Sequence, residues 1–137
     1  MLIHKRIAVG GAIVHTGTPM KILEFAFIAY PVTDLARARA FYEGPLGLVP
    51  ATLHEYSPSV EYEVGPHVLM ITAVPMLKPS SDGPCLSLEV EDFEDAIRDL
   101  RQHEVTFVRE PYQAPLCRVA VVLDPDGNKL IIHKRNA

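Results

Sequence analysis

Residues 85–102, CLSLEVEDFEDAIRDLRQ, contain a β-strand and an α-helix joined by one capping residue. Apolar and polar side chains alternate from Cys85 to Val90, which is typical of a strand with one face against a core. Asp92 then provides an N-cap. The apolar residues that follow recur at helical spacing: Phe93, Ala96, Ile97 and Leu100. This stretch therefore predicts a strand followed directly by an amphipathic helix.

The same order occurs earlier, in residues 22–43, ILEFAFIAYPVTDLARARAFYE. An apolar and aromatic strand is expected over residues 22–30, and Pro31 ends any helical alternative. Asp34 is the N-cap of a helix predicted over residues 35–43, which Gly44 and Pro45 terminate. Because Asp34 and Asp92 are 58 residues apart and their surroundings match, the two halves resemble one duplicated unit.

Three strands are predicted after each helix. They are expected at residues 51–56, 60–64 and 68–74, and again at residues 105–109, 118–123 and 129–134. Turns separate them, with a loop over residues 111–115 and a hairpin at Asp124-Pro125-Asp126-Gly127-Asn128. The fold class is therefore α+β, with βαβββ modules at residues 21–76 and 83–135 forming a curved mixed sheet in a single domain. Residues 1–20 are expected to be a poorly ordered N-terminal extension.

Composition excludes several classes of protein. The 137 residues carry a formal net charge of -4 with scattered Lys and Arg, which argues against a nucleic-acid partner. Two cysteines are too few for a disulfide framework and fit a reducing, cytoplasmic compartment. No apolar run approaches the length that crosses a bilayer, so no membrane association is expected.

One βαβββ unit leaves one face of its sheet bare, so two units must combine around a shared cavity. In the strand at residues 85–90, Leu86 and Leu88 lie on one side. Cys85, Ser87 and Glu89 lie on the other. The apolar side is expected to take the helix, which leaves the polar side to line the cavity.

Three motifs together resemble the vicinal oxygen chelate superfamily. They are Phe41-Tyr42-Glu43 followed by Leu46-Gly47-Leu48, then Leu88-Glu89-Val90-Glu91-Asp92, and the hairpin Asp124-Pro125-Asp126-Gly127-Asn128. This superfamily includes glyoxalase I, extradiol dioxygenases and the metal-free bleomycin-binding proteins. The resemblance covers about residues 22 to 135 and implies the fold described above.

The resemblance also implies where a divalent metal would bind. The usual ligand positions correspond to Phe27 and Cys85 on the first strands, Ile131 on the last strand, and Leu69, or Ile71 in another register. Hydrocarbon side chains cannot coordinate a metal, and a catalytic site normally needs about three protein ligands. We therefore expect no metal and no other cofactor, and glyoxalase or dioxygenase activity is not expected.

Several polar and aromatic residues are further candidates for ligand binding. His133 shares a face with Ile131, and Glu89 and Ser87 share one with Cys85. Arg118 could anchor an anion or form an internal ion pair, and Tyr62 or Tyr112 could provide an aromatic wall or pack in the core. His54, His67 and His103 are interpreted as ordinary surface residues. The complete predicted set is Phe27, Tyr62, Leu69, Cys85, Ser87, Glu89, Arg118, Ile131 and His133.

The leading hypothesis is a metal-free protein that binds a small organic molecule in the cavity between its modules and forms a homodimer, as the resemblance implies. A second hypothesis is a lyase, isomerase or dioxygenase that holds a metal through a shifted set, Cys85, Glu89 and His133. A third is a non-catalytic interaction domain whose cavity is filled by side chains.

Overall fold

The first module is a four-stranded sheet with one helix in the computed structural model, which describes residues 21–137. Its elements are β1 (Ile28–Pro31), α1 (Leu35–Glu43), β2 (Pro50–Leu53), β3 (Ser59–Val64) and β4 (His67–Thr72). The strand order is β1-β4-β3-β2, in which β1 runs parallel to β4 and the other neighbours are antiparallel.

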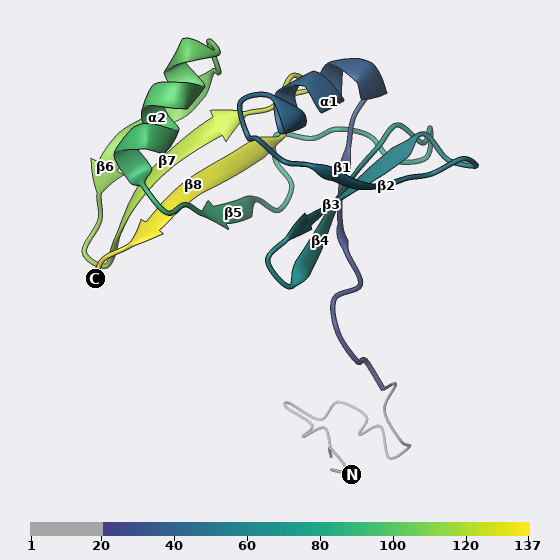
Figure 1. The fold of residues 1–137 in the computed structure, drawn as a ribbon, viewed down its shortest axis with the longest axis horizontal. Coiled ribbons are helices and arrows are strands. Elements are labelled where there is room, and N and C mark those ends of the chain that lie inside the picture. The colour runs from purple at the N-terminus through teal and green to yellow at the C-terminus, as the bar shows by residue number, and fades with distance from the viewer. Residues whose placement is uncertain (1–20) are drawn as a thin grey trace, which may run out of the picture.

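The second module repeats this arrangement. Its elements are β5 (Leu86–Glu89), α2 (Phe93–Gln102), β6 (Phe107–Gln113), β7 (Cys117–Leu123) and β8 (Lys129–Arg135), and the strand order is β5-β8-β7-β6. Figure 1 shows the two sheets on opposite sides of the molecule, each with its own helix. The predicted α+β fold with two βαβββ modules is confirmed, although the eight strands form two separate sheets.

Both helices begin directly after the aspartates that were predicted as N-caps, α1 at Leu35 and α2 at Phe93. The side chain of Asp34 accepts a hydrogen bond from the backbone N–H of Arg37 at 3.0 Å, and Asp92 does the same for Asp95 at 3.0 Å. Each cap satisfies a backbone donor that the first helical turn leaves free. The first helix spans the predicted residues, and Gly44 caps its C-terminal end.

Each sheet has an inner face that packs against a helix and an outer face that no helix covers. In the first sheet, alternate residues of β3 and β4 point to the inner face and are buried. In the second sheet, the same is true of alternate residues of β7 and β8. The buried residues are Val60, Tyr62, Leu69, Ile71, Ala120, Val122, Leu130 and Ile132. The intervening residues, such as Glu61, Met70, Ile131 and His133, therefore lie on the outer faces.

The two modules meet through the inner face of the first sheet. Tyr30, which shares that face with Ile71, donates its hydroxyl to the backbone carbonyl of Lys129 at 2.8 Å and accepts the backbone N–H of Leu86. The side chain of Asn128 donates to the carbonyl of Pro31 at 2.8 Å. Because the second module lies against the inner face, the outer face of the first sheet is turned away from it. The expected cavity shared by both outer faces is therefore not formed within one chain.

Two strands differ most from expectation, and β2 and β4 also end before the predicted residues 56 and 74. The first begins at Ile28 instead of residue 22, since β1 pairs with β4 only from Ile28 onward. The strand β6 continues through the predicted loop to Gln113, and its pairing with β7 has two register shifts, the second of which spans Pro111. None of the helices in the described residues is both long and apolar enough to span a membrane. The predicted extension at residues 1–20 falls outside the part that the structure describes.

Candidate functional site

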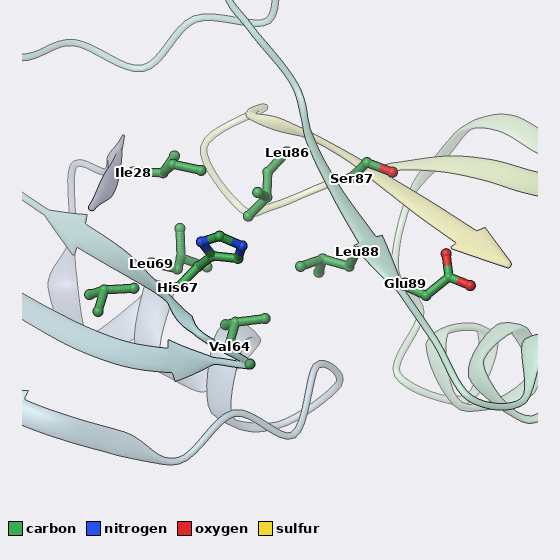
Figure 2. Close-up of a pocket in the computed structure, with 10 residues that line it drawn as sticks. Ile28, Val64, His67, Leu69, Leu86, Ser87, Leu88 and Glu89 are labelled. Carbon is green, nitrogen blue, oxygen red and sulfur yellow. The ribbon is translucent and has the colours of Figure 1, made fainter. Parts of the chain in front are cut away.

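Strand β5 separates two candidate surfaces. Figure 2 shows Leu86 and Leu88 pointing into a cleft between the modules, whereas Ser87 and Glu89 point away from it. Leu86 and Leu88 pack against the buried core, and Ser87 and Glu89 are exposed. The predicted division of this strand into an apolar and a polar side is confirmed.

The cleft between the modules has a volume of about 320 Å³ and an apolar lining. Ile28, Val64 and Leu69 contribute from the first sheet, and Leu86 and Leu88 lie opposite them (Figure 2). The imidazole of His67 also points into this space, although the sequence indicated only a surface role. We refer to this space as the inter-module cleft.

The outer face of the second sheet carries a different set of side chains, in two rows that cross all four strands. Strand register aligns Ser87, Ile131, Val121 and Arg109 in one row, and Glu89, His133, Val119 and Tyr112 in the other. Residues paired in register point to the same side of a sheet. The face therefore has an aliphatic centre with polar groups at both edges.

At one edge, Glu89 and His133 form a close pair. Nδ1 of His133 lies 2.6 Å from Oε1 of Glu89, so Nε2 is the ring nitrogen left for other partners. The other carboxylate oxygen accepts the backbone N–H of Arg135 at 2.9 Å. This backbone hydrogen bond, followed by the bond to His133, holds the pKa of Glu89 below its usual value. Glu89 is therefore an ionised group that orients the imidazole.

At the other edge, the guanidinium of Arg109 stacks on the ring of Tyr112, 4.2 Å from its centroid. None of the ion pairs found among residues 21–137 includes Arg109. Its donors are therefore available to an anion. Sequence reasoning missed Arg109 because the register shifts of β6 decide which of its side chains reach this face.

The positions that would hold a metal do not fit one. Ala29 pairs with Met70 as Ser87 pairs with Ile131, so the first-module counterpart of Ile131 is Met70, and neither Leu69 nor Ile71 occupies it. With Phe27, Cys85 and Ile131, the set contains two hydrocarbons and two soft sulfur groups. Nor does any cluster of three His, Cys, Asp or Glu side chains within residues 21–137 have the arrangement a metal ion needs. The shifted set that includes Cys85 is not assembled in this chain.

The structure separates three predicted residues from the polar face. Tyr62 is fully buried on the inner face and donates its hydroxyl to Glu43 at 2.9 Å. Leu69 is also on the inner face and reaches only the inter-module cleft. Arg118 stacks on Phe93 and pairs with Glu94 of α2, which is the internal ion pair considered as its alternative. Each of the three is the sequence neighbour of a residue that points to the outer face, so its own side chain points to the inner face.

The other predicted residues lie where a ligand can reach them. Ser87, Glu89, Ile131 and His133 are brought together on the outer face of the second sheet, and Cys85 is exposed next to β5. Phe27 lies on the outer face of the first sheet, in a hollow of about 270 Å³. Met70 and the pair formed by His54 and Glu61, whose side chains are 2.6 Å apart, also line this hollow.

Comparison with known proteins places this architecture in a family. The family model "Glyoxalase/Bleomycin resistance protein/Dioxygenase superfamily" matches residues 24–132. The chain therefore belongs to this superfamily. Among curated proteins, none matches the chain in sequence.

Solved structures share the fold at low sequence identity. The antibiotic binding protein TnmS3 from Streptomyces sp. CB03234 superposes with a TM-score of 0.70 at 22% identity, over 86% of this chain and 100% of that one. A glyoxalase/dioxygenase from Nostoc punctiforme gives 0.68 and 22%, over 87% and 99%. A glyoxalase-related enzyme from Fulvimarina pelagi gives 0.69 and 20%, over 83% and 89%. These similarities establish the fold.

Proposed function

We propose that the protein binds a flat, anionic organic molecule on the outer face of its second sheet, without a metal. The observation that carries this proposal is the pair of side-chain rows across this sheet. Val119, Val121 and Ile131 offer an aliphatic floor for a ring, His133 lies beside it on β8, and Arg109 lies beside it on the edge strand β6. Apolar surface with a few convergent polar groups is the usual composition of a small-molecule site.

Charge favours an anionic ligand over a neutral one. In addition to Arg109, the register places Lys129 and Arg135 on the same face as Ile131 and His133. Glu89 already accepts one hydrogen bond on each carboxylate oxygen, from His133 and from the backbone of Arg135. A carboxylate or acidic phenol can pair with Arg109 while its ring covers the aliphatic floor.

A second copy of the chain is proposed to complete the site. A single sheet face is open to water, whereas small-molecule sites usually enclose most of their ligand. The outer face of the first sheet, with Phe27 and Met70, is turned away from the second module of its own chain, and we propose that it covers the second module of a partner. The named ligand of TnmS3, an antibiotic, supports small-molecule binding by this fold only as an analogy.

Calorimetric titration with 2-naphthoate tests the proposal, with 2-naphthamide as the uncharged control. We expect 2-naphthoate to bind at least about tenfold more tightly than the amide, and Arg109→Gln to remove most of that difference. Ile131→Asp should abolish binding, because it removes apolar surface and repels the carboxylate, whereas Leu116→Asp, in an exposed turn, should leave it unchanged. Undiminished binding by Ile131→Asp, or equal affinity for both compounds, would contradict the proposal.

A further inference from the structure

The backbone of β5 has one edge that no strand covers. Within residues 21–137, β5 pairs only with β8, so its second edge is free. The N–H of Val90 donates to the carbonyl of His133 on β8 at 2.9 Å. The N–H of Leu86 also points toward β8, where the Tyr30 hydroxyl links it to the carbonyl of Lys129. Leu86 and Val90 therefore direct their backbone groups to β8.

Ser87 directs its backbone groups to the free edge. The N–H and C=O of one strand residue point to the same edge, and those of the next residue point to the opposite edge. Ser87 follows Leu86, so both of its backbone groups face away from β8. Ser87 and Glu89 line the inter-module cleft, although Figure 2 shows their side chains pointing away from it. The cleft wall therefore contains a backbone donor and acceptor at Ser87 that no strand of the described chain pairs.

Apolar side chains surround this backbone edge. Leu86 and Leu88 flank Ser87 and point into the cleft. From the first sheet, Ile28 and Val64 point toward them (Figure 2). The volume of about 320 Å³ is at the lower end of the range for small-molecule sites. The cleft is thus suited to a compact, flat ligand of about two fused rings.

The charges around the cleft favour a neutral ligand. The residues of the described chain that line it include no lysine or arginine, and the carboxylate of Glu89 points away and contacts His133. A charged ligand would find only the imidazole of His67 in the cleft. An ion that leaves water without an opposite charge loses much more hydration free energy than a neutral ring does. The cleft therefore differs from the outer face of the second sheet, where Arg109 favours an anion.

We propose that the inter-module cleft binds a neutral, flat heterocycle with adjacent hydrogen-bond donor and acceptor groups, such as a cyclic amide or an amino-substituted azine. The acceptor of the ligand receives the N–H of Ser87, and its donor bonds to the C=O of Ser87, as a neighbouring strand would. The rings contact Leu86 and Leu88 on one side and Ile28 on the other. This site lies within one chain and does not depend on the proposed function.

Titration of the ¹⁵N-labelled full chain with 2-quinolinone, followed by two-dimensional NMR, tests the proposal. This compound carries an adjacent N–H and C=O on two fused rings. The backbone amide signals of Leu86, Ser87 and Leu88 should shift together. The control, 1-methyl-2-quinolinone, lacks the donor and should bind at least about tenfold more weakly, because it leaves the C=O of Ser87 unpaired.

Ser87→Pro removes the backbone N–H that the ligand requires. Proline is tolerated in a strand where its nitrogen faces a free edge, so this variant should keep the circular dichroism spectrum of the wild type. It should bind 2-quinolinone at least about tenfold more weakly than Ser87→Ala, which loses the same hydroxyl but keeps the N–H.

A second variant tests the apolar wall and serves if Ser87→Pro does not fold. Ile28 is 40% exposed, so Ile28→Asp should fold, and its carboxylate in the cleft should weaken 2-quinolinone binding at least about tenfold. Leu116→Asp, in an exposed turn, is the matched control and should bind like the wild type.

Four results would overturn the cleft site: no binding of 2-quinolinone by the wild type at about 1 mM, equal affinity for the methylated compound, equal affinity of the folded Ser87→Pro and Ser87→Ala variants, or displacement of 2-quinolinone by 2-naphthoate. Loss of binding at high protein concentration would show that a second chain fills the cleft, and would also overturn it. A wild type that binds 2-quinolinone but no 2-naphthoate would reject the proposed function and retain the cleft site.

Discussion

The hydroxyl of Tyr42 donates a hydrogen bond of 2.9 Å to Oδ2 of Asp124, which links α1 of the first module to the turn before β8 in the second. Both residues are buried, and burial raises the pKa of Tyr42, so its hydroxyl remains a donor. The same carboxylate accepts the side-chain amide of Asn128 at 2.8 Å and the backbone N–H groups of Asp126 and Asn128. One aspartate therefore holds both the hairpin turn and the module junction.

Tyr42→Phe should lower the free energy of unfolding by roughly 1.5 to 3 kcal/mol, because it removes a buried donor from a charged acceptor. Urea denaturation followed by circular dichroism measures this loss. Tyr56→Phe is the control, since Tyr56 is almost fully exposed. Equal stability of Tyr42→Phe and the wild type would show that the bond does not hold the modules together.

Glu43 should make stability depend on pH in the acid range. The hydrogen bond from the Arg39 side chain, at 2.6 Å, lowers the pKa of Glu43, and the Tyr62 hydroxyl reinforces this effect. Because the folded pKa is below that of the unfolded chain, the contribution is fully present above the unfolded value of about 4.5 and is lost as pH falls through the folded value.

Glu43→Gln should therefore be less stable than the wild type by up to about 1 kcal/mol at neutral pH, and the difference should disappear in strong acid. Denaturant titrations at several pH values measure this difference. Glu55→Gln, at an exposed carboxylate, should show no such trend. A difference that grows on acidification would contradict the sign of the pKa change.

Glu89→Gln should weaken 2-naphthoate binding about three- to tenfold, because an amide orients the His133 ring less strongly than a carboxylate. Since the pKa of Glu89 is lowered, the effect should be present at neutral pH and diminish only in acid, once the wild-type carboxylate is itself protonated. Calorimetry at two pH values measures it, and Glu91→Gln is the control. Unchanged affinity would mean that the pair does not contact this ligand.

The wild type should not bind Ni²⁺, Zn²⁺ or Mn²⁺ stoichiometrically, because Ile131 and Phe27 offer no donor atoms. Ser87→His/Ile131→Glu should gain affinity for Zn²⁺, since these register partners would lie beside His133 on one face. Calorimetry with each ion measures both outcomes. Stoichiometric binding by the wild type, abolished by His133→Gln, would restore the metal-dependent alternative.

Local patterns in the sequence were sufficient for the elements and their order. The N-caps Asp34 and Asp92 fixed both helix starts, and the alternation around Ser87 assigned the faces of β5. Both signals come from residues close together in the sequence: an N-cap bonds a backbone N–H three residues later, and strand alternation repeats every two residues.

Long-range register was not predictable in the same way. Tyr62, Leu69 and Arg118 fell on the inner faces because a shift of one residue reverses every side chain of a strand. Arg109 depends on the irregular pairing of β6, which contains a proline that indicated a loop. The placement of β5 against the inner face of the first sheet depends on Tyr30, whose partners are 56 and 99 residues away.

The phenol of Tyr30 touches the beginnings of two adjacent parallel strands, at Leu86 and Lys129. A ligand that binds to Ile131 and His133 and shifts β8 would therefore also change the hydrogen bonds of Tyr30, which belongs to the first sheet. Occupancy of one half of the protein would then alter hydrogen exchange in the other, even though the two exposed surfaces face different directions.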